Sequence, residues 1–328
     1  MDRPKALLLT EGMHGMISQV EGMAKALRVE YSHKIVRLSF PWNFVPPKFT
    51  PVSQIILKDK IYLSENFLPN LIISCGRKSV IPSILLKKKN PKIFTIHIQD
   101  PKVNLKNFDI IVAPEHDNLN GANIFNSKGA IHYITDSEIN NAKSYLGSKI
   151  NGEKIVSLIL GGPNKYYNFD RDQLIKIFRE VRFNFINQGF KIIVIPSMRT
   201  PKLIIDLAVN EFKKDGYVLS FVDKQAYLSA LALATYVVVT SDSTSMISEA
   251  ATSGKPIFVA HMEAKKDNYR FKKFYQLFKE MGIIRDLGEN VENWKYNRLN
   301  EAERIAKEIN IKIEKWNCGI FKLIKKKI

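Results

Sequence analysis

Short runs of apolar residues alternate with longer amphipathic stretches along the whole chain. Continuous apolar runs of this kind are typical of strands buried on both faces, and the stretches between them fit helices packed on a parallel sheet. In the first half, strands are expected at Ala6–Leu9, Lys34–Leu38, Leu71–Ser74, Ile93–Ile98, Asp109–Ala113 and Ile131–Ile134. In the second half, they are expected at Ile155–Leu160, Lys191–Pro196, Val218–Ser220, Tyr236–Thr240 and Pro256–Ala260. The pattern predicts an α/β fold.

The length of 328 residues is about twice that of a usual domain, which favours two domains. A polar stretch at Gly147–Glu153 separates the two strand series. We therefore expect one domain at 1–150, a second at 151–308, and the end of a C-terminal helix with a basic tail at 309–328. The two cysteines lie far apart without CxxC spacing, which argues against a disulfide framework or a zinc site and for a reducing compartment.

The net charge is +18, from 50 basic and 32 acidic residues. This sign suits a phosphorylated ligand, an anionic membrane or nucleic acid. Nucleic acid is not expected as a partner, because no zinc-finger, RNA-recognition or basic-zipper signature accompanies the charge. The apolar runs are far shorter than the ~20 residues that cross a bilayer, and no signal peptide is evident. The sequence predicts a cytoplasmic protein.

Several predicted strands end in small or polar residues, and ligands of open α/β sheets bind beyond the carboxyl ends of strands. The strongest signal is a buried strand at 236–240 that leads into a hydroxyl-rich turn and a helix. Ser243, Thr244 and Ser245 lie at the helix start, where free N–H groups and the helix dipole suit a phosphate, and Asp242 or Ser243 caps the helix. Glu249 stands further along, where a carboxylate can accept hydrogen bonds from ribose hydroxyls. The alternative is an ordinary capped helix with a solvated Glu249.

Two more strand-end loops in this half are candidates for the same crevice. Gly161 and Gly162 allow close approach of backbone to a ligand, and the planar guanidinium of Arg199 suits a diphosphate. Arg199 can also be a surface residue of a Pro-bounded turn. Asp170 and Asp172 resemble a metal-binding DxD motif, but they precede an amphipathic helix and fit an N-cap better. No metal is expected.

The first half offers several residues for a general base. His14 lies in a loop that also contains Gly12, Gly15 and Gln19, while Asp100 follows another predicted strand. His116 and Asp117 follow a third, next to Glu115, and Arg77 follows a fourth. His14, Asp100, His116 and Asp117 all remain candidates, because the sequence does not choose among them.

Taken together, these motifs resemble the mitochondrial fission ELM family. The resemblance rests on Ser74-Cys-Gly-Arg, Ile98-Gln-Asp-Pro, Ala113-Pro-Glu-His-Asp, Leu160-Gly-Gly, Pro196-Ser-Met-Arg-Thr-Pro and Val239-Thr-Ser-Asp-Ser-Thr-Ser-Met-Ile-Ser-Glu-Ala, and covers about residues 6–308 in order. It implies a GT-B glycosyltransferase-like protein with two facing Rossmann-like domains, a nucleotide-sugar held by the second and an acceptor by the first, without a catalytic metal or other cofactor. The chain departs from the family pattern where His14 precedes Gly15 and where Met198-Arg199 replaces an arginine pair.

The leading hypothesis is an enzyme: a metal-independent glycosyltransferase that moves a sugar from a nucleotide-sugar donor to a cell-envelope glycolipid or polysaccharide. A sugar-nucleotide epimerase or hydrolase on the same fold is one alternative. A non-catalytic scaffold at a membrane surface is another.

Three segments suit an anionic membrane surface, which predicts a cytoplasmic protein that is peripheral on the inner face of the membrane. Phe40–Phe49 gathers four aromatic residues in a Pro-bounded loop, and Lys87–Lys89 form a basic cluster. The tail Ile320–Ile328 combines apolar and basic residues. The alternative for the loop is that its aromatic side chains pack on their own domain.

Overall fold

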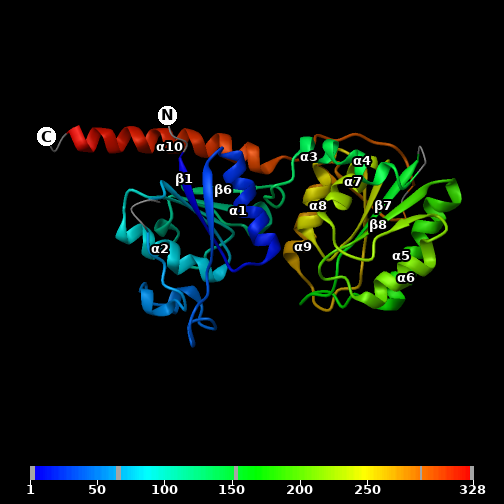
Figure 1. The fold of residues 1–328 in the computed structure, drawn as a ribbon, viewed down its shortest axis with the longest axis horizontal. Helices are drawn as coiled ribbons and strands as arrows, with labels where there is room; N and C mark the ends of the chain where they lie inside the picture. Colours follow the sequence, from blue (N-terminus) through cyan, green and yellow to red (C-terminus); the bar gives the residue numbers. More distant parts are fainter. Residues whose placement is uncertain (1–3, 64–67, 151–153, 289, 326–328) are drawn as a thin grey trace. The chain divides into compact units, whose positions relative to one another are not determined.

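The computed structural model describes residues 4–63, 68–150, 154–288 and 290–325, with side chains described as far as residue 313. The chain forms two compact units (Figure 1). The first consists of residues 1–133 and 300–328, and the second of residues 134–299.

The first unit contains a parallel sheet of six strands in the order β2-β1-β3-β4-β5-β6. The strands are β1 (Lys5–Thr10), β2 (Glu30–Ile35), β3 (Leu71–Cys75), β4 (Phe94–Ile98), β5 (Ile110–Pro114) and β6 (Ile124–Ser127). The helices are α1 (His14–Ala26), α2 (Val80–Lys89) and α10 (Glu301–Lys325). The strand order reverses between β1 and β3, and such a switch point is where open α/β sheets bind ligands.

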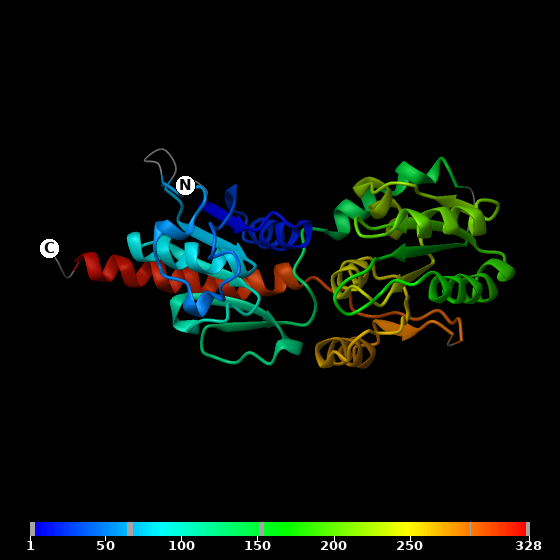
Figure 2. The same ribbon diagram turned by 90° about the horizontal axis from the view of Figure 1, so that it is seen from below.

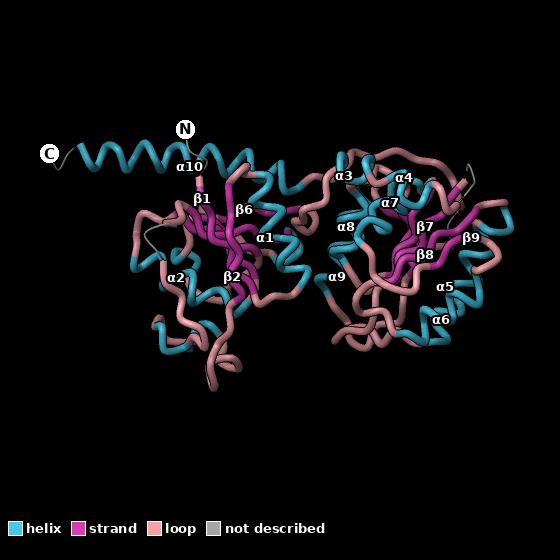
Figure 3. Tube along the Cα trace, viewed as in Figure 1, coloured by secondary structure: helices cyan, strands magenta, loops and turns pink. Residues whose placement is uncertain are grey.

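Both faces of this sheet are covered, as the alternation along β1 shows. Ala6 and Leu8 join a core with residues of α1 and α10, whereas Leu7 and Leu9 join a second core with residues of α2. Successive side chains of a strand point to opposite faces. Helices therefore lie on both sides of the strands (Figure 3).

The second unit contains a parallel sheet of six strands in the order β12-β11-β10-β7-β8-β9. The strands are β7 (Ile155–Leu160), β8 (Lys191–Pro196), β9 (Gly216–Val218), β10 (Tyr236–Thr240), β11 (Ile257–Ala260) and β12 (Ile284–Asp286). The helices are α3 (Asp136–Asn141), α4 (Lys143–Gly147), α5 (Arg171–Asn184), α6 (Lys202–Phe212), α7 (Lys224–Leu233), α8 (Thr244–Ala251) and α9 (Tyr269–Glu280). This is the strand order of a Rossmann fold, with its switch point between β7 and β10.

The predicted α/β class is confirmed, and most predicted strands coincide with observed ones. Ile131–Ile134 is not a strand. This segment is buried, but it packs on α1, where a side chain at Gly22 would meet the carbonyl oxygen of His132 at 2.3 Å. The sequence analysis missed β6 and β12, which lie at sheet edges and have short or mixed sequences. It also placed β2 and β9 a few residues too far along the chain.

The division between the units lies at 133/134, not near residue 150. The helices α3 and α4 contact α7, and Leu146 and Ile150 belong to a core of the second unit. These contacts explain why residues 134–150 belong to that unit. The polar stretch expected as the boundary runs into residues 151–153, which lie outside the described residues.

Helix α10 returns the chain to the first unit, where it runs alongside the sheet (Figures 1 and 2). Its inner residues Ala302, Ile305, Ala306 and Ile309 recur at three- and four-residue spacing and lie in the core with α1. At its start, the buried Glu301 accepts hydrogen bonds from the Lys128 backbone N–H and from the Arg304 guanidinium, both at 2.7 Å. Residues 300–308 thus complete the first unit and not the second. The last residues of the expected basic tail, 326–328, lie outside the described residues.

Among the described residues, none of the helices combines the length and the apolar character that crossing a bilayer requires.

Ile305→Ala should destabilise the first unit by about 2–5 kcal/mol, because it empties a fully buried position between α10 and the sheet. Ile311→Ala on the same helix is the matched control, since that side chain is 54% exposed and should change stability little. Urea unfolding of the full chain measures both variants. Equal effects of the two substitutions would contradict the packing of α10 described above.

Candidate functional site

The candidate site of the second unit is built from three loops that follow neighbouring strands β10, β7 and β8. Gly161 and Gly162 follow β7, the turn Ser197–Thr200 follows β8, and Ser241–Ser243 follow β10. The first and third of these loops flank the switch point of the sheet, where the sequence analysis placed the donor nucleotide.

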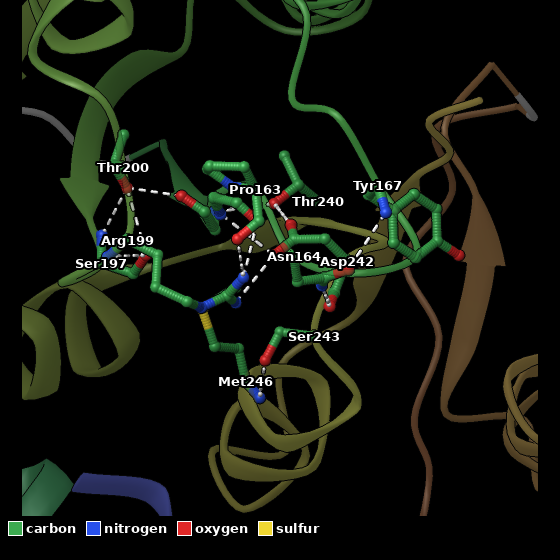
Figure 4. Close-up of polar contacts among 12 residues, drawn as sticks. Pro163, Asn164, Tyr167, Ser197, Arg199, Thr200, Thr240, Asp242, Ser243 and Met246 are labelled. Carbon is green, nitrogen blue, oxygen red and sulfur yellow. Dashed lines mark hydrogen bonds and ion pairs between the residues drawn. The ribbon is translucent and has the colours of Figure 1, made fainter. Parts of the chain in front are cut away.

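Asp242 is the centre of the network that joins these loops (Figure 4). Its side chain is fully buried and forms an ion pair with Arg199 at 2.8 Å. The carboxylate also accepts a hydrogen bond from the Gly162 backbone N–H at 3.0 Å and from the Thr240 hydroxyl at 2.7 Å. One buried charge is thereby shared among loops from all three strands.

The two glycines serve this packing. A side chain at Gly161 would place its Cβ 2.1 Å from the Asp242 carboxylate, and one at Gly162 would place it 2.1 Å from the Arg199 carbonyl oxygen. Only glycine permits such an approach. The predicted role, closeness of the backbone to a ligand, stays a prediction, whereas closeness to neighbouring loops is observed.

Arg199 does not project freely toward solvent. Its guanidinium donates to Asp242 and to the carbonyl oxygens of Gly162, at 2.5 Å, and Pro163, at 3.4 Å. The side chain keeps 38% exposure, so part of the group remains accessible. The structure thus adds a loop-joining role to the diphosphate contact that the sequence predicted for this arginine.

Helix α8 begins within the same network. The Ser243 side chain accepts the Met246 backbone N–H at 3.4 Å, which makes Ser243, and not Asp242, the N-cap. Thr244 and Ser245 occupy the first turn and are half-buried. Backbone N–H groups of a first helical turn have no acceptor within the helix. Binding of an anion at this end of α8, which the sequence predicts, stays a prediction.

Glu249 is half-buried on α8 and accepts a hydrogen bond from the Tyr227 hydroxyl of α7 at 3.1 Å. Burial raises the pKa of its carboxyl group to about 7, although the bond from Tyr227 acts in the opposite direction. Glu249 is thus partnered within the protein and titrates near neutral pH. The reading of Glu249 as a simply solvated residue is wrong.

Two neighbouring features were not singled out from the sequence. Asn164 donates to the Asp242 carbonyl oxygen at 3.0 Å, and Lys265 donates to the Asn164 carbonyl oxygen at 3.1 Å, which brings a cation to this sheet edge. His261, directly after β11, contacts Asp286 at 2.7 Å. Their partners lie far away in sequence, so no local spacing signals these pairs.

Asp170 caps α5 through the Asp172 backbone N–H, as the N-cap interpretation predicted.

In the first unit, the strand-end loops also meet at the switch point. Glu11, directly after β1, accepts the Lys78 backbone N–H at 3.0 Å and pairs with the Lys78 ammonium at 3.3 Å. Gln19 of α1 accepts hydrogen bonds from the Cys75 thiol at 3.5 Å and from the Gln99 amide at 3.3 Å. Gln99 follows β4 with a φ of 85°, in the left-handed region that non-glycine residues rarely adopt. Of these residues, the sequence analysis had selected only Gln19.

The four candidate bases follow different strands. His14 begins α1 after β1, and its ring lies 3.5 Å from the Tyr133 hydroxyl. Asp100 follows β4; partial burial acts to raise its pKa, but hydrogen bonds and charge from Lys102 lower it. His116 and Asp117 lie together after β5, with 3.7 Å between Nε2 and Oδ1. The strands β1 and β5 are three positions apart in the sheet, about 14 Å, so His14 and Asp117 follow well-separated strand ends.

The other residues expected on the acceptor side lie in loops and at helix starts of the first unit. Gly12 has a φ of 88° in the turn after β1, Gly15 lies in the first turn of α1, and Glu115 is exposed at the start of a short 3-10 helix. Arg77 donates to the backbone carbonyl oxygens of Asn43 and of Val45, the latter at 2.9 Å. Arg77 therefore holds a neighbouring loop, and its contact with an acceptor stays a prediction.

Known structures with similar folds support the assignment of fold. UDP-GlcNAc 2-epimerase from Methanocaldococcus jannaschii superposes with a TM-score of 0.52 and 15% identity, covering 94% of this chain and 99% of that one. UDP-GlcNAc 2-epimerase from Neisseria meningitidis gives 0.52 and 12% over 94% and 100%. Two parallel α/β units of this kind form a GT-B-like fold.

The sequence comparisons identify the family. The protein RP120 of Rickettsia prowazekii is 26% identical, over 89% of this chain and 94% of that protein. Mitochondrial fission protein ELM1 of Arabidopsis thaliana is 24% identical, over 74% of this chain and 63% of the plant protein. The model of the family "Mitochondrial fission ELM1" matches residues 14–313. The chain therefore belongs to the mitochondrial fission ELM1 family.

Proposed function

We propose that this protein is a metal-independent glycosyltransferase that uses a nucleotide-sugar and transfers its sugar to a hydroxyl of a cell-envelope glycolipid or polysaccharide. The observation that carries the proposal is the meeting of three loops and the start of α8 at the switch point of the second unit. The solved Neisseria epimerase, which has a similar fold, is bound to UDP-GlcNAc. That likeness supports a nucleotide-sugar as ligand.

The diphosphate of the donor binds at the first turn of α8. The N–H groups of Thr244 and Ser245, their hydroxyl groups and the helix dipole offer hydrogen bonds and positive potential there. Donors fixed in place before the reaction stabilise the charge that develops on a departing diphosphate. Lys265 and the accessible part of Arg199 add cationic groups at the same edge.

The ribose of the nucleotide binds near Glu249. Its carboxylate accepts hydrogen bonds from ribose hydroxyls, and Tyr227 holds one of its oxygens in place. Carboxylate acceptors form stronger hydrogen bonds than neutral groups.

The first unit supplies the acceptor and the general base, because attack by a hydroxyl requires removal of its proton. His14, Asp100, and the pair His116 and Asp117 are separate alternatives for this role. The partly buried Glu11 carboxylate at the switch point is a further candidate.

An epimerase or hydrolase of sugar nucleotides is the second candidate, since the two solved structures compared above are epimerases. Product analysis without any acceptor separates the two, because only the second candidate turns over under that condition. A scaffold at a membrane surface would bind no nucleotide.

We also propose a cytoplasmic location, peripheral to the inner face of the membrane.

Nucleotide binding is tested by a thermal-shift panel of UDP, GDP, CMP and TDP. A nucleotide at about a hundredfold its Kd should stabilise the protein by ~2.7 kcal/mol and raise the melting midpoint. The double variant Thr244→Val with Ser245→Ala should weaken binding about tenfold or more, because it removes two hydroxyl donors to a charged ligand. Ser220→Ala, an exposed hydroxyl after β9, is the control. No response to any nucleotide would refute the donor site.

Arg199→Ala should destabilise the second unit by roughly 3 kcal/mol, since it leaves the buried Asp242 carboxylate without its cation. Adding Asp242→Asn should restore part of this loss, because the neutral amide needs no partner charge. Urea unfolding measures both variants. A double variant no more stable than Arg199→Ala alone would show that the ion pair is not the cause.

Glu249 should make stability depend on pH. Its pKa is raised to about 7 in the folded protein, so the folded state binds a proton that the unfolded state has already released above about pH 4.3. Stability should therefore fall as pH rises from about 4.3 to about 7, and Glu249→Gln should lack this contribution. Urea unfolding across this range measures it, with the exposed Glu263→Gln as control. Parallel curves for wild type and Glu249→Gln would contradict the raised pKa.

A further inference from the structure

The first unit carries an ordered loop whose large apolar side chains face solvent. We name residues 40–56 the aromatic loop. Phe40 is 83% exposed, Phe44 75%, Phe49 66% and Ile55 72%. In Figure 1 this segment is the lighter blue loop at the lower end of the first unit. Four such side chains within one short segment exceed the scattered exposure that is normal for a surface.

The loop is held in one conformation by its inner side. Trp42 and Val52 pack against a core cluster of the first unit, to which the buried Ile56 belongs. The Ser39 backbone N–H donates to the Ile56 carbonyl oxygen at 2.8 Å, which ties the two ends of the loop together and brings Ile55 near Phe40. Trp42 is thus packed against the core, whereas Phe40, Phe44 and Phe49 are exposed to solvent.

Arg77 fixes the loop to the sheet. Its two guanidinium nitrogens donate to the Asn43 and Val45 carbonyl oxygens, and Arg77 follows β3 at the carboxyl edge of the sheet. The aromatic loop therefore adjoins the edge where the candidate acceptor residues of this unit lie. An ordered apolar surface beside a substrate edge indicates a partner that is itself apolar.

The charges around the loop identify that partner. Within residues 37–60, the exposed charged side chains are those of Arg37, Lys48, Lys58 and Lys60 and of a single acid, Asp59. The Lys48 ammonium lies over the Phe49 ring, 4.6 Å from its centre. Aromatic side chains favour the boundary between water and lipid, and basic residues favour anionic headgroups.

We propose that the aromatic loop is the surface by which this protein docks on an anionic lipid bilayer, with Phe40, Phe44, Phe49 and Ile55 entering the interface. The docking requires no transferase activity, but it would bring the acceptor edge of the first unit to a lipid-borne substrate. The basic cluster Lys87–Lys89, expected from the sequence at the same membrane surface, lies apart from the aromatic loop. These lysines end α2, about 15 Å along the helix from Arg77. Lys87 is also paired with Asp109 at 2.8 Å.

The test is co-sedimentation of the full chain with vesicles of phosphatidylcholine alone and of phosphatidylcholine mixed equally with phosphatidylglycerol. Wild type should bind the mixed vesicles, and raised salt should weaken binding. Phe44→Ser with Phe49→Ser should lower the partition coefficient at least about tenfold, because both side chains leave the interface. Phe183→Ser on α5, where the side chain is 71% exposed, is the matched control and should bind like wild type.

A second double variant removes two charges and leaves every apolar residue of the loop unchanged. Lys48→Gln with Lys58→Gln should reduce binding to mixed vesicles and leave the residual binding less sensitive to salt. Unchanged binding of both double variants would overturn the proposal, as would complete loss of binding on truncation after Cys318 with the loop intact. The proposal would also be overturned if wild type did not bind vesicles and the aromatic loop served another partner. In that case the phenylalanine substitutions would abolish self-association or RNA binding. The nucleotide panel is independent, so failure of docking and failure of the donor site are distinguishable.

Discussion

The charge of Asp242 is the constraint on which the second unit depends. A carboxylate without solvent exposure is tolerated only when a cation and hydrogen-bond donors surround it. Arg199, Thr240 and the Gly162 backbone meet that need, and each comes from a different strand end. Satisfying one buried charge thus fixes the relative positions of three loops.

The same requirement explains why two successive glycines follow β7. Gly161 yields space to the Asp242 carboxylate and Gly162 yields space to the Arg199 backbone. A side chain at either position would push the loops apart. The Asp242 carboxylate would then be exposed to solvent or lose its hydrogen-bond partners. The start of α8 then keeps its place beside the switch point, because Ser243 caps it from the residue next to Asp242. In the first unit, Glu11 and Lys78 form a comparable but less buried link between the loops after β1 and β3.

Strands with long apolar runs, such as Ile155–Leu160, were predictable, because burial on both faces leaves a clear mark in sequence. Edge strands such as β12 left none, and helical periodicity alone does not say which sheet α10 covers. The sequence also predicted that the loops after β7, β8 and β10 contribute to one candidate site, and the structure joins these loops through Asp242. The sequence did not show that Arg199 pairs with Asp242, because 43 positions separate them and only the fold brings them together. The choice of base stayed open because equivalent residues follow several strands.

The pairing of Arg199 has a consequence for how an anion would be held. An arginine joined to a buried carboxylate forms a pair with almost no net charge, so its long-range attraction for a diphosphate is largely cancelled. The first turn of α8 and the Lys265 ammonium also contribute positive potential at this edge. Arg199 acts first by fixing the loop after β7 against the loop after β10, and the accessible part of its guanidinium contributes directional hydrogen bonds at short range. In the donor complex proposed above, Arg199 would therefore act mainly by orienting the diphosphate, while the start of α8 and Lys265 would attract it.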